Sequence, residues 1–324
     1  MQKKILLISN NFAVGWAGHL TAAGSVIRSL QSSLSPDMTT LESVRQVLTK
    51  PDTSQLGSLE VSLIGWVIDT DGQHCFLWNS LYPGKLFPGV PQYDGSGDLT
   101  ARALFGAKGL HHASPPDHID PHEVSRGALS MTTLLMAYEF WDPSTKQLGF
   151  GCAYEILQLV DGTHFKYLDD ALFIPIAFDL DDRGRYLGVK FCASQVKYKA
   201  QGNCSTFYIY DPIKNAQEVY TIPPPGPYPV EAESATEQLR QHVVNETFSF
   251  PFESDYYCCS FRLRSPTFET TKAFFVARKD EAKIHGVRIN IEEHAIGIDV
   301  SREWVEWMFN YVRTRETEVA LRDT

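Results

Sequence analysis

The sequence has no excess of positive charge and no long apolar run. Its 324 residues include 29 Lys and Arg against 39 Asp and Glu, which gives a formal net charge of -10 at pH 7. A nucleic-acid groove or a contact with anionic lipid requires clustered Lys and Arg, so this balance argues against both. No stretch approaches the roughly 20 apolar residues of a membrane-spanning helix. The sequence therefore predicts a protein with no nucleic-acid partner and no membrane partner.

Cysteine pairs of the metal-binding or redox type are also missing. The six cysteines form no Cys-x-x-Cys motif, and reduced thiols in a cytoplasm are the usual state of such a set. The start has two lysines and the short apolar run 5–8 before Asn10 and Asn11, which is unlike a signal peptide. Hence we expect a cytoplasmic location and no cofactor. A hydrophobic content of 43% is enough for one large core or two ordinary ones.

The first 34 residues predict a β-hairpin that leads directly into a helix. Two short apolar strands flank Asn10 and Asn11, and Ala17 and Gly18 join the second strand to a helical pattern over residues 19–34. Glycine at such an exit permits backbone conformations that are closed to other residues. Further local predictions follow in chain order: a hairpin over 59–78 that turns at 69–72, a Gly95-Ser96-Gly97 turn, a helix over 128–141 that ends at Asp142, and a strand over 153–160.

This succession of elements resembles the proteasome-type N-terminal nucleophile (Ntn) hydrolases over roughly residues 3–175. The resemblance implies an α+β protein whose residues 1–178 form a four-layer αββα sandwich. It also implies roles for single residues. Lys4 would lower the proton affinity of the nucleophile, Gly18 would supply the oxyanion N–H, and Ser96 and Asp142 would be supporting hydrogen-bond partners. Trp16 falls where the family has its substrate side-chain pocket, which the indole would fill.

The nucleophile that this chemistry requires is absent from the given sequence. In the family it is a threonine at the chain's own N-terminus, whose free amine acts as the base. Its strand precedes the matched lysine, where this sequence has only Met1, Gln2 and Lys3. The matched positions would then be vestigial, and we expect a non-catalytic assembly or binding protein that forms a homo-oligomer or joins a related subunit. The alternative is a threonine-type peptidase or Ntn amidohydrolase whose nucleophile segment is missing from the sequence.

Residues 179–324 predict a β-rich accessory region that resembles no family. Alternation of apolar and polar residues is typical of half-buried strands and recurs along this half. The predicted strands cover residues 186–192, 195–199, 205–210, 218–222, 256–264, 272–278, 287–291 and 295–300. The proline-rich segment 223–229 separates two groups of strands. Ser301 is the expected N-cap of a final amphipathic helix that runs to about residue 315.

A cluster of histidines and acids between residues 111 and 123 offers a different hypothesis. Imidazoles and carboxylates can together hold a transition metal. The histidines of this cluster are His111, His112, His118 and His122. Three prolines interrupt the segment and no His-Glu-x-x-His spacing occurs, so we expect no metal site. A metal-dependent hydrolase that uses this cluster is the second alternative function.

Overall fold

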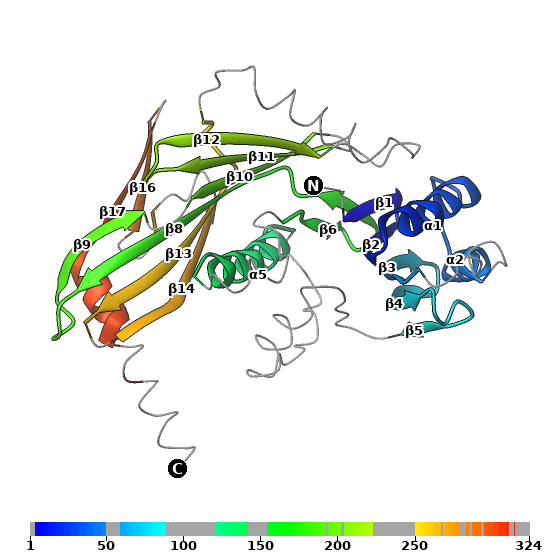
Figure 1. Cartoon of the computed structure of the whole chain (residues 1–324), viewed down its shortest axis with the longest axis horizontal. Helices are drawn as coiled ribbons and strands as arrows, with labels where there is room; N and C mark the ends of the chain where they lie inside the picture. The colour runs from blue at the N-terminus through cyan, green and yellow to red at the C-terminus, as the bar shows by residue number, and fades with distance from the viewer. Residues whose placement is uncertain are drawn as a thin grey trace, which may run out of the picture.

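The structure is a computed structural model in which strands outnumber helices (Figure 1). It describes residues 4–49, 59–88, 121–141, 154–191, 194–201, 204–222, 250–266, 268–278, 283–284, 287–292, 295–310 and 314. Within these residues the strands form sheets of five, seven, three and two strands. The five-stranded sheet lies at one end of the molecule and the seven-stranded sheet at the other (Figure 1).

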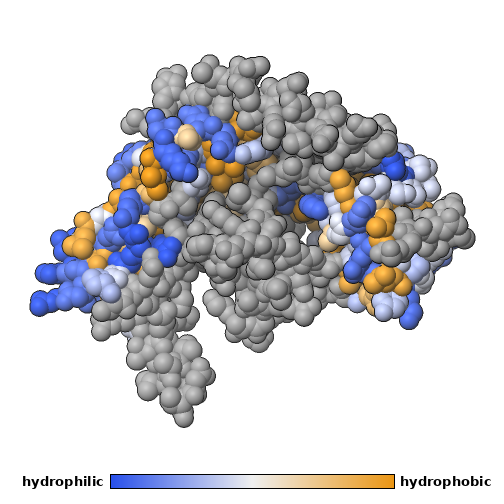
Figure 2. All heavy atoms as spheres, in the orientation of Figure 1, coloured by the Kyte–Doolittle hydropathy of each residue, from blue (hydrophilic) through white to orange (hydrophobic). Residues whose placement is uncertain are grey.

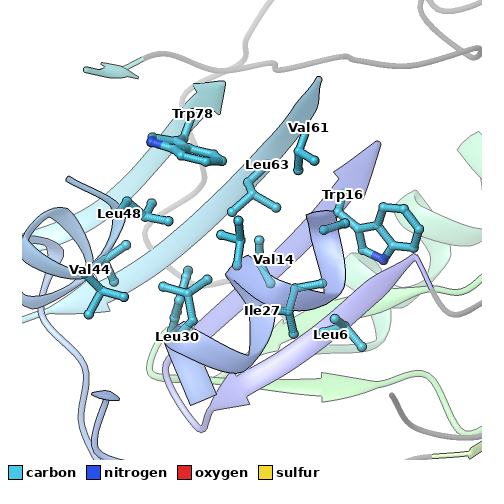
Figure 3. Close-up of a cluster of buried hydrophobic side chains, with 14 of the residues drawn as sticks. Leu6, Val14, Trp16, Ile27, Leu30, Val44, Leu48, Val61, Leu63 and Trp78 are labelled. Carbon is cyan, nitrogen blue, oxygen red and sulfur yellow. The ribbon is translucent and has the colours of Figure 1, made fainter. Parts of the chain in front are cut away.

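The five-stranded sheet is an antiparallel meander whose strands lie in chain order. Its strands are β1 (Ile5–Ser9), β2 (Phe12–Gly18), β3 (Val61–Asp69), β4 (Gly72–Asn79) and β5 (Leu86–Pro88). Helices α1 (Leu20–Ser33) and α2 (Leu41–Leu48) pack on one face of it. Figure 3 shows this core, in which Leu30 and Val44 from the helices meet Val14 and Leu63 from the strands. The predicted hairpins and the helix after Gly18 are therefore confirmed.

Asp69 connects α2 to the turn between β3 and β4. One oxygen of its carboxylate accepts the backbone N–H of Leu41 at the start of α2, at 3.0 Å, and the other accepts the N–H of Asp71 at 3.0 Å. His74 Nε2 lies 3.0 Å from the same carboxylate. These contacts hold the pKa of Asp69 below its usual value, although burial alone would raise it. The ionised carboxylate therefore stabilises both the turn and the helix start.

A short hairpin links this unit to the rest of the protein. It comprises β6 (Leu157–Val160) and β7 (His164–Tyr167), and its turn contains positive φ angles at Asp161 and Gly162. The Phe165 N–H donates to the carbonyl of Asn10 at 2.8 Å. The Phe165 ring packs edge-on against Trp66 of β3, with 5.4 Å between centroids. The hairpin thus contacts the five-stranded unit through both backbone and side chains.

The seven-stranded sheet is organised around β8 (Asp170–Leu180), which pairs with β9, β10 and β13. The β8–β13 pairing is parallel, and the other pairings in this sheet are antiparallel. Besides β8, the strands are β9 (Tyr186–Phe191), β10 (Gln195–Gln201), β11 (Cys204–Asp211), β12 (Ala216–Ile222), β13 (Tyr256–Ser265) and β14 (Phe268–Arg278). Because β8 is buried on both faces, its residues read as a continuous apolar run.

Different elements cover the two faces of this sheet. Helix α5 (Pro121–Trp141) contributes Leu129 to the core that includes Phe173 of β8. On the other face, Ile174 of β8 belongs to a core that the helix over 302–310 completes with Val305. The small sheet of β15 (Lys283–Ile284), β16 (Val287–Glu292) and β17 (Ala295–Val300) contributes to this second core. Ser301 accepts the Trp304 N–H at 3.1 Å, as its predicted N-cap role requires.

The predicted four-layer αββα sandwich is wrong. The two large sheets lie at opposite ends of the described molecule and do not stack as the inner layers of a sandwich (Figure 1). Helix α5, which was expected to be an outer layer of the first half, packs on β13 and β14. The domain boundary expected after residue 178 falls inside β8. The cause is the β8–β13 pairing, which joins residues about 85 positions apart and leaves no mark on local sequence patterns.

Candidate functional site

Three of the residues predicted to be functional meet at one end of the five-stranded sheet. Lys4 precedes β1, while Trp16 and Gly18 lie near the end of strand β2. The Lys4 ammonium lies 3.5 Å from the centroid of the Trp16 ring, a cation–π contact. Trp16 is 8% exposed and projects at the margin of the core drawn in Figure 3. The indole is therefore the observed neighbour of the lysine charge.

The same end of the sheet is connected to the seven-stranded sheet by a carboxylate. One oxygen of Glu155 accepts the backbone N–H of Lys4 at 3.3 Å, and the other accepts the hydroxyl of Ser205 on β11 at 2.6 Å. Beside it, the Tyr167 hydroxyl donates to the carbonyl of Ile5 at 3.0 Å. Burial, followed by the charge of Glu155, raises the pKa of Tyr167, so this phenol stays protonated and keeps donating. We call Lys4, Trp16, Glu155, Tyr167 and Ser205 the joint.

Position 18 requires glycine because the backbones of β2 and of the residue before β3 approach closely there. Its φ is +99°, and a Cβ on it would lie 2.2 Å from the carbonyl oxygen of Glu60. The next residue, His19, donates its N–H to that same carbonyl at 2.8 Å. The glycine thus allows the chain to leave β2 beside the start of β3 and to enter α1. A larger residue here would have to displace backbone atoms.

The remaining predicted site residues are not placed beside the joint by the structure. Ser96, Asp142, His111, His112 and His118 lie outside the described residues. The backbone of His122 belongs to α5, but its side chain is outside the described part. Among the residues that the structure does describe, no group of three or more His, Cys, Asp and Glu could hold a metal ion.

A second polar cluster, which the sequence did not reveal, lies in the seven-stranded sheet. The Lys197 side chain on β10 is 3% exposed, and its Nζ lies 2.9 Å from Asp170 Oδ2 on β8. The same ammonium donates to the carbonyl of Glu253. Ser254 donates its hydroxyl to Asp170 Oδ1 at 2.5 Å. The cluster therefore fastens the segment before β13 to β8 and β10.

Burial governs the electrostatics of this second cluster. It raises the pKa of Asp170 and lowers the pKa of Lys197, and the attraction between the two groups opposes both shifts. Perturbed groups beside a serine would suit acid–base chemistry. Ser254, however, is 2% exposed and so is closed to a substrate. In the sequence, Lys197 stands between Val196 and Tyr198, an alternation that is typical of a strand with a solvated polar face. Nothing in the neighbouring sequence indicates that residues 250–255 cover the Lys197 side chain.

Comparison with protein-family models and with curated proteins finds no match to this chain. In the part of the chain that the structure describes, no helix combines the length and apolarity needed to cross a membrane. Cys75, Cys258 and Cys259 carry free thiols, and burial raises the pKa of each.

Proposed function

We propose that this chain is a non-catalytic binding or assembly protein of the cytoplasm. The observation that carries the proposal is the position of the Lys4 ammonium over the Trp16 indole. An Ntn-type lysine acts through the hydroxyl nucleophile that it faces. In the described part of the chain, the Lys4 ammonium makes no hydrogen bond to a hydroxyl or thiol. Lys4 instead takes part, through its backbone N–H, in the Glu155 contact that joins the five-stranded sheet to the seven-stranded sheet.

The surface supports a binding role. Large apolar side chains are exposed near both ends of the molecule, and such side chains mark contact surfaces when they gather. They include Leu59, Leu81, Tyr82, Leu187, Ile213 and Trp307. The free thiols of the described cysteines agree with a reducing compartment. As partner we propose a second copy of this chain or a related subunit.

Reaction with electrophiles tests the proposal. The full chain is incubated with a fluorophosphonate, which phosphonylates activated hydroxyls, and with a β-lactone, which acylates activated serine and threonine hydroxyls, and its intact mass is measured. We expect no added mass in the parent chain or in Trp16→Ala, which opens space beside Lys4. Added mass that is lost in Lys4→Met would overturn the proposal in favour of an Ntn peptidase or amidohydrolase. Stoichiometric metal in elemental analysis would favour the metal-dependent hydrolase.

A further inference from the structure

Lys197 and Asp170 hold an amine and a carboxyl group next to each other inside the seven-stranded sheet. In the β8–β10 register Lys197 lies opposite Leu172, and Lys199 lies opposite Asp170. Lys197 and Asp170 are therefore diagonal neighbours on one face of the sheet. Lys197 Nζ lies 2.9 Å from Asp170 Oδ2, and the carboxyl carbon is one bond beyond that oxygen. The fold thus keeps the nitrogen within reach of a carbon that it could attack.

This pair is largely removed from water. The Lys197 side chain is 3% exposed and that of Asp170 is 16% exposed, although many hydrophilic atoms lie at the surface of this end of the molecule (Figure 2). Leu172 and Tyr257, which pair across β8 and β13, are fully buried in the adjoining core. In water an amine and an acid remain two hydrated ions, and burial removes the hydration that stabilises them. Compared with solution, the site therefore favours the uncharged amine and acid.

The protonation of the two groups also suits a condensation. Burial raises the pKa of Asp170 and lowers the pKa of Lys197, so a proton passes from the ammonium to the carboxylate more readily here than in water. The charge of Asp255 adds to the shift of Asp170 and opposes that of Lys197, whereas the charge of Lys199 adds to the shift of Lys197. Proton transfer leaves a neutral amine, which is a nucleophile, and a neutral acid, which can lose an oxygen as water.

The segment before β13 supplies groups that hold both partners. The Ser254 hydroxyl donates to Asp170 Oδ1 at 2.5 Å. A donor already in place at that oxygen stabilises the negative charge of a tetrahedral intermediate. The Glu253 carbonyl accepts from Lys197 Nζ and keeps the nitrogen beside Asp170. Because both reacting groups belong to the chain, the burial of Ser254 that excludes an external substrate does not exclude this step.

We propose that Lys197 and Asp170 join in an intramolecular amide bond, which links β10 covalently to β8. Lys197 Nζ passes a proton to Asp170 Oδ2, and its lone pair then bonds to the carboxyl carbon while the C=O π electrons move to Oδ1. The C=O bond re-forms, the bond from carbon to Oδ2 breaks, and Oδ2 leaves as water. Two of the ammonium hydrogens leave in that water, and the third stays on the amide nitrogen. The ion pair described above is the reactant of this step, and measurements of its strength apply to chain in which the amide has not formed.

Intact mass under denaturing conditions tests the bond. We expect the folded full chain to be lighter than its amino-acid sequence by one water, and proteolysis to yield a branched peptide that joins the segments around residues 170 and 197. Lys197→Arg should abolish this mass deficit, because a guanidinium keeps the positive charge but stays protonated and does not attack. Lys199→Arg, two residues along the same strand, is the matched control and should retain the deficit.

Ser254→Ala tests the role of the hydroxyl. It keeps both reacting groups, so in samples taken during cell-free synthesis the deficit should appear at least about tenfold more slowly than in the parent chain. Appearance at the parent rate would overturn the assigned role of Ser254. A full chain whose mass still matches its sequence after prolonged incubation would overturn the proposal, as would a deficit that survives in Lys197→Arg or maps to other residues. These outcomes are separate from the reaction with electrophiles, which adds mass and tests the proposed function.

Discussion

Lys4 and Lys197 show how differently the two large units of this protein accommodate a cation. Lys4 keeps contact with water at the joint and rests on an indole ring. Lys197 is buried in the seven-stranded sheet and depends on the Asp170 carboxylate. Partial burial lowers the pKa of Lys4, and full burial lowers that of Lys197 against the pull of Asp170. We therefore expect the Lys4 ammonium to be replaceable at small cost, whereas removal of the Lys197 ammonium would leave the Asp170 carboxylate buried without its cation.

The largest expected effect comes from Lys197→Met. It leaves the Asp170 carboxylate in the sheet without its cation, and breaking one side of a buried pair typically costs about 3 to 5 kcal/mol. Urea unfolding should show this loss in the free energy of unfolding. Lys199→Met, two residues along the same strand, is the control and should cost less than about 0.5 kcal/mol. Adding Asp170→Leu to Lys197→Met should recover most of the loss, and failure to recover it would place the effect outside the ion pair.

Gly18→Ala should have the next largest effect, and it lies in the unit that carries Lys4. The new Cβ would meet the Glu60 carbonyl at 2.2 Å while the backbone stays at positive φ, so we expect a loss of about 3 kcal/mol. Gly72→Ala separates the two causes, because Gly72 also has a positive φ but open space around its Cβ position. It should cost only about 1 kcal/mol in thermal unfolding. Equal losses in the two variants would mean that the close approach to β3 is unimportant.

Asp69→Asn should produce a smaller loss that depends on pH. The pKa of Asp69 is lowered in the folded protein, so its contribution is present above the unfolded value of about 3.9 and fades as pH falls through the folded pKa. At pH 7 we expect a loss of about 1 kcal/mol from weakened hydrogen bonds to Leu41 and Asp71. The gap between variant and parent should narrow in urea unfolding below about pH 4. A gap that is constant with pH would contradict the role of the ionised carboxylate.

Sequence patterns anticipated features that depend on neighbours along the chain. The hairpin before Gly18 and the helix cap at Ser301 were predictable because turn and cap chemistry is local. Lys4 and Trp16 lie next to each other in the fold because one hairpin contains both, so their proximity is also a local feature. The wrong sandwich and the missed Asp170 cluster share a different cause. The actual sheet and the Asp170 cluster both require β8 to pair with β10 and β13, which follow it along the chain. Local sequence patterns do not show which distant strands will pair.

Lys4→Met should have the smallest effect, although it is the same chemical change as Lys197→Met. Methionine keeps much of the apolar stem against Trp16, so the variant loses chiefly the cation–π attraction, which is worth about 0.5 to 1 kcal/mol at an exposed site. The substitution does not remove a partner of the Glu155 carboxylate, because Glu155 accepts the Lys4 backbone N–H and not its ammonium. Urea unfolding of both methionine variants in one buffer gives the comparison directly. A loss from Lys4→Met as large as that from Lys197→Met would show that the joint depends on its cation as strongly as the core does.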